Sequence, residues 1–76
     1  MSERDAYLQC VRDFVIEIRL LAHRGETDRI WEISEDLEYL IDCLVRGDLE
    51  TAKTVVNKIC LGSGLMHVEQ KLKERL

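Results

Sequence analysis

The chain has 76 residues, a length that allows one domain and leaves no room for a second. Its formal net charge of −4 at pH 7 is the reverse of the charge expected of a nucleic-acid-binding protein. No apolar run approaches the ~20 residues that cross a bilayer, and the charged start Met-Ser-Glu-Arg-Asp is unlike a signal peptide. We therefore expect a cytoplasmic protein without a membrane segment.

Cysteine usage narrows the ways in which so short a chain can be stabilised. A domain of this size buries only about 60% of its unfolded surface, so it usually needs disulfides, a metal, oligomerisation or very regular helix packing. Its cysteines, Cys10, Cys43 and Cys60, are odd in number, widely spaced and without a C-x-x-C pair. This pattern indicates buried free thiols in a reducing compartment, and neither a disulfide framework nor a zinc site. Helix packing and oligomerisation remain.

Glycines divide the chain into helical lengths, and no alternating strand pattern occurs. We predict an all-α fold, a small antiparallel bundle of three to four helices in one domain, residues 1–76, completed by homodimerisation. The expected helices span about residues 3–24, 28–46, 49–60 and 65–75. The alternative for the last part is one helix from Asp48 to the end, weakened by Gly62 and Gly64.

The first predicted helix begins after Ser2, which resembles the start of a capping box with Asp5. Its buried stripe, with Val15 and Ala22 at the margin, consists of Tyr7, Cys10, Val11, Phe14, Ile18 and Leu21. Ile16 and Leu20, one turn apart, fall on the polar side. Either this helix is covered on two sides within the bundle, or the pair is a self-association patch.

The second predicted helix has the most regular apolar stripe of the chain. Its expected buried residues, with Val45 at the edge, are Ile30, Ile33, Leu37, Leu40, Ile41 and Leu44. Its other side is strongly acidic, with basic residues only at the two ends of the helix; the acids are Glu32, Glu35, Asp36, Glu38 and Asp42. Several of these acids are like-charge pairs at i,i+3 or i,i+4, which together cost the helix about 1 kcal/mol.

Asp48 is expected to cap the third helix, whose inward residues would be Leu49, Ala52, Val56, Ile59 and Cys60. In the last segment, Leu65, Val68, Leu72 and Leu76 form a narrow stripe, which is typical of a helix on a bundle surface or paired with another chain. The predicted dimer interface therefore consists of Ile16, Leu20, Leu65, Val68 and Leu72.

Charge is segregated along the sequence. Residues 25–50 hold nine acids and two bases, whereas residues 51–76 hold two acids and five bases. The basic residues of the second group could neutralise the acids within the chain; they are Lys53, Lys58, Lys71, Lys73 and Arg75. Alternatively, the acids meet a basic surface of another protein, with Tyr39 as an anchor and Trp31 at the edge of the same face. The predicted partner-binding residues are Glu32, Glu35, Tyr39 and Asp42.

Sites for chemistry are not indicated by the sequence. His23 and His67 stand apart, no serine lies in a nucleophile elbow, and the Glu-x-x-His motif of helical metal sites does not occur. We expect no catalytic residue, metal or cofactor, and hence no enzyme.

We expect a small protein-binding regulator or inhibitor, of the adaptor, antitoxin or immunity type. One alternative is a dimeric DNA-binding protein that uses residues 48–59, with Lys53, Thr54, Asn57 and Lys58 on its reading helix. Another is a structural subunit of a larger assembly.

Overall fold

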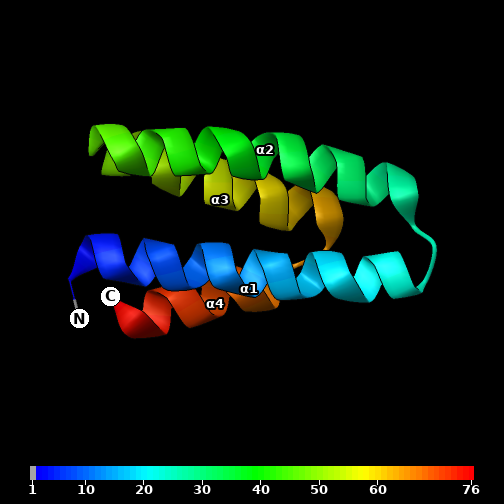
Figure 1. The fold of residues 1–76 in the computed structure, drawn as a ribbon. Helices are drawn as coiled ribbons and strands as arrows, with labels where there is room; N and C mark the ends of the chain where they lie inside the picture. Colours follow the sequence, from blue (N-terminus) through cyan, green and yellow to red (C-terminus); the bar gives the residue numbers. More distant parts are fainter. Residues whose placement is uncertain (1) are drawn as a thin grey trace.

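The computed structural model describes residues 2–76, and nearly all of them lie in four α-helices (Figure 1). The helices are α1 (Glu3–His23), α2 (Thr27–Arg46), α3 (Leu49–Ser63) and α4 (Met66–Arg75). Successive helices run in opposite directions, so that both ends of the described chain lie at the same end of the molecule. The prediction of an all-α antiparallel bundle is confirmed, with four helices; Met1 lies outside the described residues.

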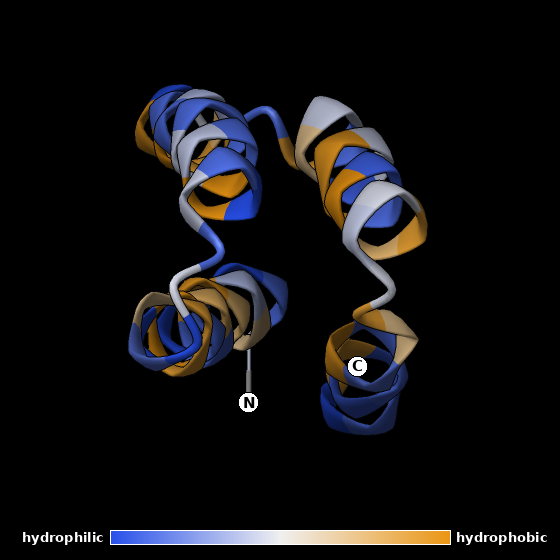
Figure 2. Cartoon of the chain, turned by 90° about the vertical axis from the view of Figure 1, so that its right-hand side faces the viewer, coloured by the Kyte–Doolittle hydropathy of each residue, from blue (hydrophilic) through white to orange (hydrophobic). Residues whose placement is uncertain are grey.

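Seen from the end, the helices occupy the corners of a square and follow the chain around it (Figure 2). Each helix packs against the next, and α4 closes the ring against α1. α1 also touches α3 across one diagonal, whereas α2 and α4 make no contact within residues 2–76. The acid-rich helix and the C-terminal helix therefore lie at opposite corners of the bundle.

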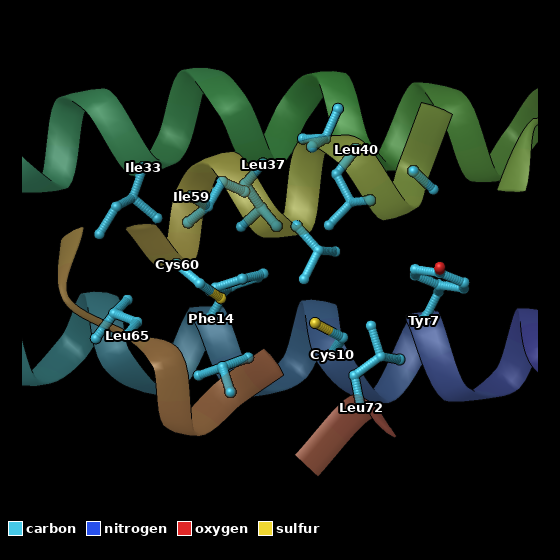
Figure 3. Packing of buried hydrophobic residues seen from close by; sticks show 14 of the residues in the cluster. Tyr7, Cys10, Phe14, Ile33, Leu37, Leu40, Ile59, Cys60, Leu65 and Leu72 are labelled. Atoms are coloured by element: carbon cyan, nitrogen blue, oxygen red, sulfur yellow. The ribbon is translucent and has the colours of Figure 1, made fainter. Parts of the chain in front are cut away.

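The core lies between the layer of α1 and α4 and the layer of α2 and α3 (Figure 3). Tyr7, Cys10 and Phe14 rise from α1 toward the apolar side chains of α2 and α3. The largest fully buried side chains are Tyr7, Phe14, Ile33, Leu40, Ile59, Val56, Val68, Cys10, Cys43 and Cys60. Burying each large apolar side chain stabilises the fold by about 1.5–3 kcal/mol. Over residues 2–76, no helix has both the length and the apolar character needed to cross a bilayer.

Local capping contacts explain where α1 and α3 begin. The Ser2 hydroxyl accepts a hydrogen bond of 3.1 Å from the Asp5 amide, as the sequence predicts. At α3, Asp48 Oδ1 accepts from the Thr51 amide at 3.1 Å, and Oδ2 accepts from the Thr51 hydroxyl at 2.6 Å. The bonds from the Asp5 and Thr51 N–H groups satisfy amides that have no partner within the first turn of a helix.

The break in the last part of the chain occurs at Gly64, which has the left-handed φ of +69° that ends α3. α3 therefore continues three residues beyond the expected end and contains Gly62. The alternative of one helix from Asp48 to the end is wrong, because the chain reverses direction between α3 and α4.

Two expectations about the apolar stripes are wrong. One is the pairing of the C-terminal stripe with another chain: Leu65, Val68 and Leu72 are buried because α4 packs against α1 and α3 of the same chain, and Leu76 is the exposed member of the stripe. Conversely, the apolar margins of α1 and α2 are not covered by any helix. The exposed margin residues are Val15, Ala22, Ile41 and Val45. The core instead takes in Cys43 and Val55, and Ser63 is a buried polar residue.

Candidate functional site

The four predicted partner-binding residues all lie on the exposed side of α2. Glu32, Glu35 and Asp42 are exposed, and the Tyr39 side chain is 47% exposed between them. Their spacing of three, four and three residues places them within about 80° of one another around the helix axis. The structure thus brings the four residues together on one surface that no other helix covers.

Aliphatic side chains lie beside these acids. Ile41 is 45% exposed and Val45 is 74% exposed, although the sequence prediction placed the first in the core and the second at its edge. At 100° per residue they lie about 70° and 110° from the middle of the buried stripe. A narrower limit on the width of the buried stripe would have predicted from the sequence that Val45 is exposed.

A shallow groove of about 450 Å³ runs along this part of α2. We call it the α2 groove, and its lining residues are Glu35, Glu38, Tyr39, Ile41, Asp42 and Val45. Every one of them comes from α2, so the groove is an open surface of one helix and not a cleft between two. It joins an apolar strip to three carboxylates, the composition of a protein interface with a charged rim.

Near the start of the same helix, Trp31 is 69% exposed. It precedes Glu35 by four residues, so its side chain lies on the same side of α2 one turn before the groove. The Ser34 hydroxyl donates a 2.8 Å hydrogen bond to the backbone carbonyl of Trp31. The Trp31 ring extends the exposed surface beyond the α2 groove, as the sequence indicates.

Few of the acids on α2 have a basic partner. Asp42 Oδ2 lies 3.0 Å from Arg46 Nη1 on the same helix, and this carboxylate raises the pKa of the Arg46 guanidinium. Asp36 accepts from Lys58 of α3 at 3.2 Å. For the remaining acids on this side, the described part of the chain supplies no ion pair; these acids are Glu32, Glu35 and Glu38.

The basic residues of α4 do not neutralise the acids of α2. Lys71, Lys73 and Arg75 belong to α4, which makes no contact with α2. Arg75 pairs instead with Asp13 of α1 at 2.8 Å. Of the five basic residues considered as internal partners, only Lys58 pairs with α2 in the described chain, through Asp36.

A second hollow of about 260 Å³ lies between α2 and α3. Its lining residues are Glu32, Glu35, Asp36, Lys58, Ile59, Gly62 and Ser63. At its end, Arg29 donates to the Ser63 carbonyl and forms a 3.0 Å ion pair with Glu26, which ties the first turn of α2 to the last turn of α3. This hollow shares Glu35 with the α2 groove, so the exposed acids of α2 border both.

The predicted dimer residues are divided by the structure. Ile16 and Leu20 are exposed one turn apart on α1. Leu65, Val68 and Leu72 are buried by helices of the same chain, so they are not available to a second folded copy. The sequence could not separate these cases, because a stripe that faces its own bundle and one that faces another chain have the same periodicity.

The remaining candidates for chemistry lie in the core or stand apart. Burial raises the pKa of the Cys10 thiol to about 12 and that of Cys60 to about 11, so both stay protonated at neutral pH. His67 Nε2 lies 2.8 Å from Glu17 on the surface. In the region from residue 2 to residue 76, no three His, Cys, Asp or Glu side chains gather where they could hold a metal ion.

The residues of the alternative DNA-reading helix lie on the outside of α3. Lys53, Thr54, Asn57 and Lys58 are exposed, but α3 packs beside α2 and its Lys58 is paired with Asp36. DNA that approached these side chains would also approach the acids of α2.

Comparison of this chain with protein-family models, with curated proteins and with solved structures gave no match.

Proposed function

We propose that this chain is a small binding protein, a regulator or inhibitor, which presents the exposed side of α2 to a basic surface of another protein. The observation that carries the proposal is the set of exposed acids that form no ion pair within residues 2–76, Glu32, Glu35 and Glu38, beside exposed apolar side chains. Acids that repel one another along a helix cost stability, and a basic partner would turn that cost into attraction. The function is binding and not catalysis.

The test is to immobilise the chain, recover a partner at low ionic strength and measure its affinity. Glu35→Lys/Asp42→Lys is expected to weaken binding by about tenfold or more, because two attractive contacts become repulsive. The matched control is Glu3→Lys/Glu74→Lys, which makes the same change of net charge on exposed residues of α1 and α4. Unchanged affinity in the α2 variant, or equal losses in both, would reject the proposal.

We also propose that the chain forms a homodimer through Ile16 and Leu20 on α1. Two exposed aliphatic side chains one turn apart gain by being covered, and a chain this small gains core by pairing. Ile16→Glu/Leu20→Glu should lower the mass measured by light scattering to that of one chain. A dimer that persists in this variant would place the contact elsewhere.

We propose a reducing compartment such as the cytoplasm for this protein, because its three cysteines are buried free thiols.

A further inference from the structure

We infer that the element which the α2 groove receives is a basic amphipathic helix, lying along the C-terminal turns of α2 with its apolar side on Ile41 and Val45. This inference rests on the proposed function and adds the form of the partner to it. It depends on three features of the groove: the row of exposed apolar side chains, the spacing of the carboxylates, and a helical backbone whose N–H and C=O groups already bond to one another.

The apolar row supplies the anchors. Ile41 and Val45 are separated by one turn and stand next to each other on the surface of α2, with the Tyr39 ring two residues before Ile41. Glu38, Ile41 and Val45 follow one another at spacings of three and four residues, which is the row that packs against a second helix. No helix of this chain covers that row, because α1 and α3 leave Ile41 and Val45 exposed.

The carboxylates set the charge and the spacing of the partner. Glu35, Glu38 and Asp42 line the groove at intervals of three and four residues, and together with Val45 they extend over about 15 Å of the helix. Basic side chains at the same intervals on a facing helix would each meet one carboxylate. Only Asp42 of the three already has an ion pair, with Arg46. Charge complementarity therefore favours Lys or Arg flanking the apolar side of the partner helix.

An extended partner segment fits less well. Strand addition needs unpaired backbone groups at a sheet edge, whereas the groove lies on a helix whose backbone groups bond to one another. Successive side chains of a strand also point in opposite directions. Only every second residue of an extended partner could therefore contact the carboxylates and aliphatic side chains of α2.

A second copy of the chain is not the occupant that the groove suits. Five of the eleven basic residues lie on α3 and α4, and both helices use their apolar sides for the chain's own core. Basic residues do stand beside exposed apolar side chains on α1, where Arg12 and Arg19 each lie within one turn of Ile16. In the homodimer proposed above, the second copy covers Ile16 and Leu20, so this side of α1 is not free to enter the α2 groove. The occupant that matches is a helix of another protein.

The probe is a synthetic peptide of about 20 residues, a length that can form a helix, with leucine at spacings of three and four and lysine beside them. A scrambled peptide of the same composition is the control for charge alone. Titration of the ¹⁵N-labelled chain should give binding about tenfold tighter for the amphipathic peptide, with shifts concentrated at residues 35–46. Circular dichroism should show that the peptide becomes helical when bound.

Ile41→Ser/Val45→Ser should weaken binding of the amphipathic peptide by about tenfold. Leu61→Ser/Met66→Ser, which changes two exposed apolar residues outside both the α2 groove and the proposed dimer contact, should leave that binding unchanged. If the double variant fails to fold, Val45→Ser alone makes the same test, because Val45 is the most exposed apolar residue of α2.

Four outcomes would overturn the inference. Equal binding of the scrambled peptide, or no binding of either peptide, would reject a helical partner. Unchanged binding in the Ile41 and Val45 variants would remove the apolar anchors. A dimer that becomes monomeric in Ile41→Ser/Val45→Ser, seen by light scattering, would give the groove to a second copy. In each case the proposed function still stands or falls on charge reversal at Glu35 and Asp42.

Discussion

Cys10 and Cys60 show how burial determines the chemistry of single residues in this fold. Both side chains are fully buried, and Figure 3 shows them in the core beside Phe14. Loss of solvent disfavours the thiolate and is the main cause that raises both pKa values, and the charge of Glu69 adds to it. The thiols are therefore small apolar groups of the core that stay protonated at neutral pH.

Alkaline pH should destabilise the chain through these two thiols. In the unfolded chain they release their protons near the ordinary pKa of 9.0, whereas in the fold they keep them to about 11 and 12. Their contribution to stability is therefore complete below about pH 9 and falls as the pH rises toward the folded values, by about 1 kcal/mol per thiol and pH unit. Urea unfolding at several pH values measures it. Cys10→Ala/Cys60→Ala should show a shallower loss, and a slope equal to that of the wild type would contradict the assignment.

At the scale of elements, two kinds of glycine must be distinguished. Gly47 has a φ of +78° and ends α2, a backbone conformation that side chains with a Cβ rarely adopt. Gly62 lies inside α3 with an ordinary helical φ, and a Cβ added there would meet no atom within 4 Å. Glycine is thus required by the backbone at position 47 but not at position 62.

Gly62→Ala should therefore stabilise the chain by about 1 kcal/mol, the difference in helix propensity between the two residues. Gly47→Ala should destabilise it by about 1 kcal/mol, because alanine is strained at that positive φ. Thermal unfolding of both variants beside the wild type measures these changes. A loss of stability in Gly62→Ala would show that the position has a contact or strain that the fold does not explain.

The cap of α3 should make part of the stability depend on acidic pH. Hydrogen bonds from the Thr51 hydroxyl and amide lower the pKa of Asp48 below its ordinary value of 3.8. A lowered folded pKa stabilises the fold above the ordinary value, and this contribution disappears as the pH falls through the folded value. Compared with Asp48→Ala, the wild type should be clearly more stable at neutral pH. Its advantage should shrink in the range below about pH 4, as followed by urea unfolding. An advantage independent of pH would mean that the charge of Asp48 is not involved.

The sequence could predict some elements better than others for a physical reason. Periodicity defines which side of a helix is apolar, so Phe14, Ile33 and Leu40 were placed correctly in the core. It does not define how many neighbours a helix has. The burial of Val68 in α4 and the exposure of Ile41 in α2 depend on which corner of the bundle each helix occupies, and that depends on the whole chain.

On the scale of the whole molecule, the bundle keeps the acids of α2 away from most of the bases. The like-charged side chains Glu32, Glu35 and Glu38 remain without an ion pair in the described chain, at intervals of three residues. Glu35 lies between the other two and repels both. The predicted partner-binding residues share one exposed surface, as expected for residues at helical spacing. The α2 groove, in contrast, could not be predicted from the sequence, because it depends on the exposure of Ile41 and Val45.

Glu35→Gln should raise the free energy of unfolding by about 0.5 kcal/mol at low ionic strength, because it removes two repulsions. Added salt screens exposed charges, so the gain should shrink in about 0.5 M NaCl. Urea unfolding at the two salt concentrations measures both effects. The control Glu74→Gln removes an exposed acid of α4 that lies three residues from Lys71, and it should give no gain. A gain that is independent of salt would point to a cause other than charge.

The diagonal placement of α2 and α4 gives the molecule an electric dipole across its short dimensions, since the negative helix and the basic C-terminal helix lie at opposite corners. In the field of a positively charged partner such a molecule turns so that α2 leads and α4 trails. Orientation before contact raises the association rate and makes it fall with salt, whereas the lifetime of a complex depends on the apolar contacts. For the proposed basic partner, this arrangement would set the speed of the encounter, and the exposed apolar side chains of α2 would set its duration.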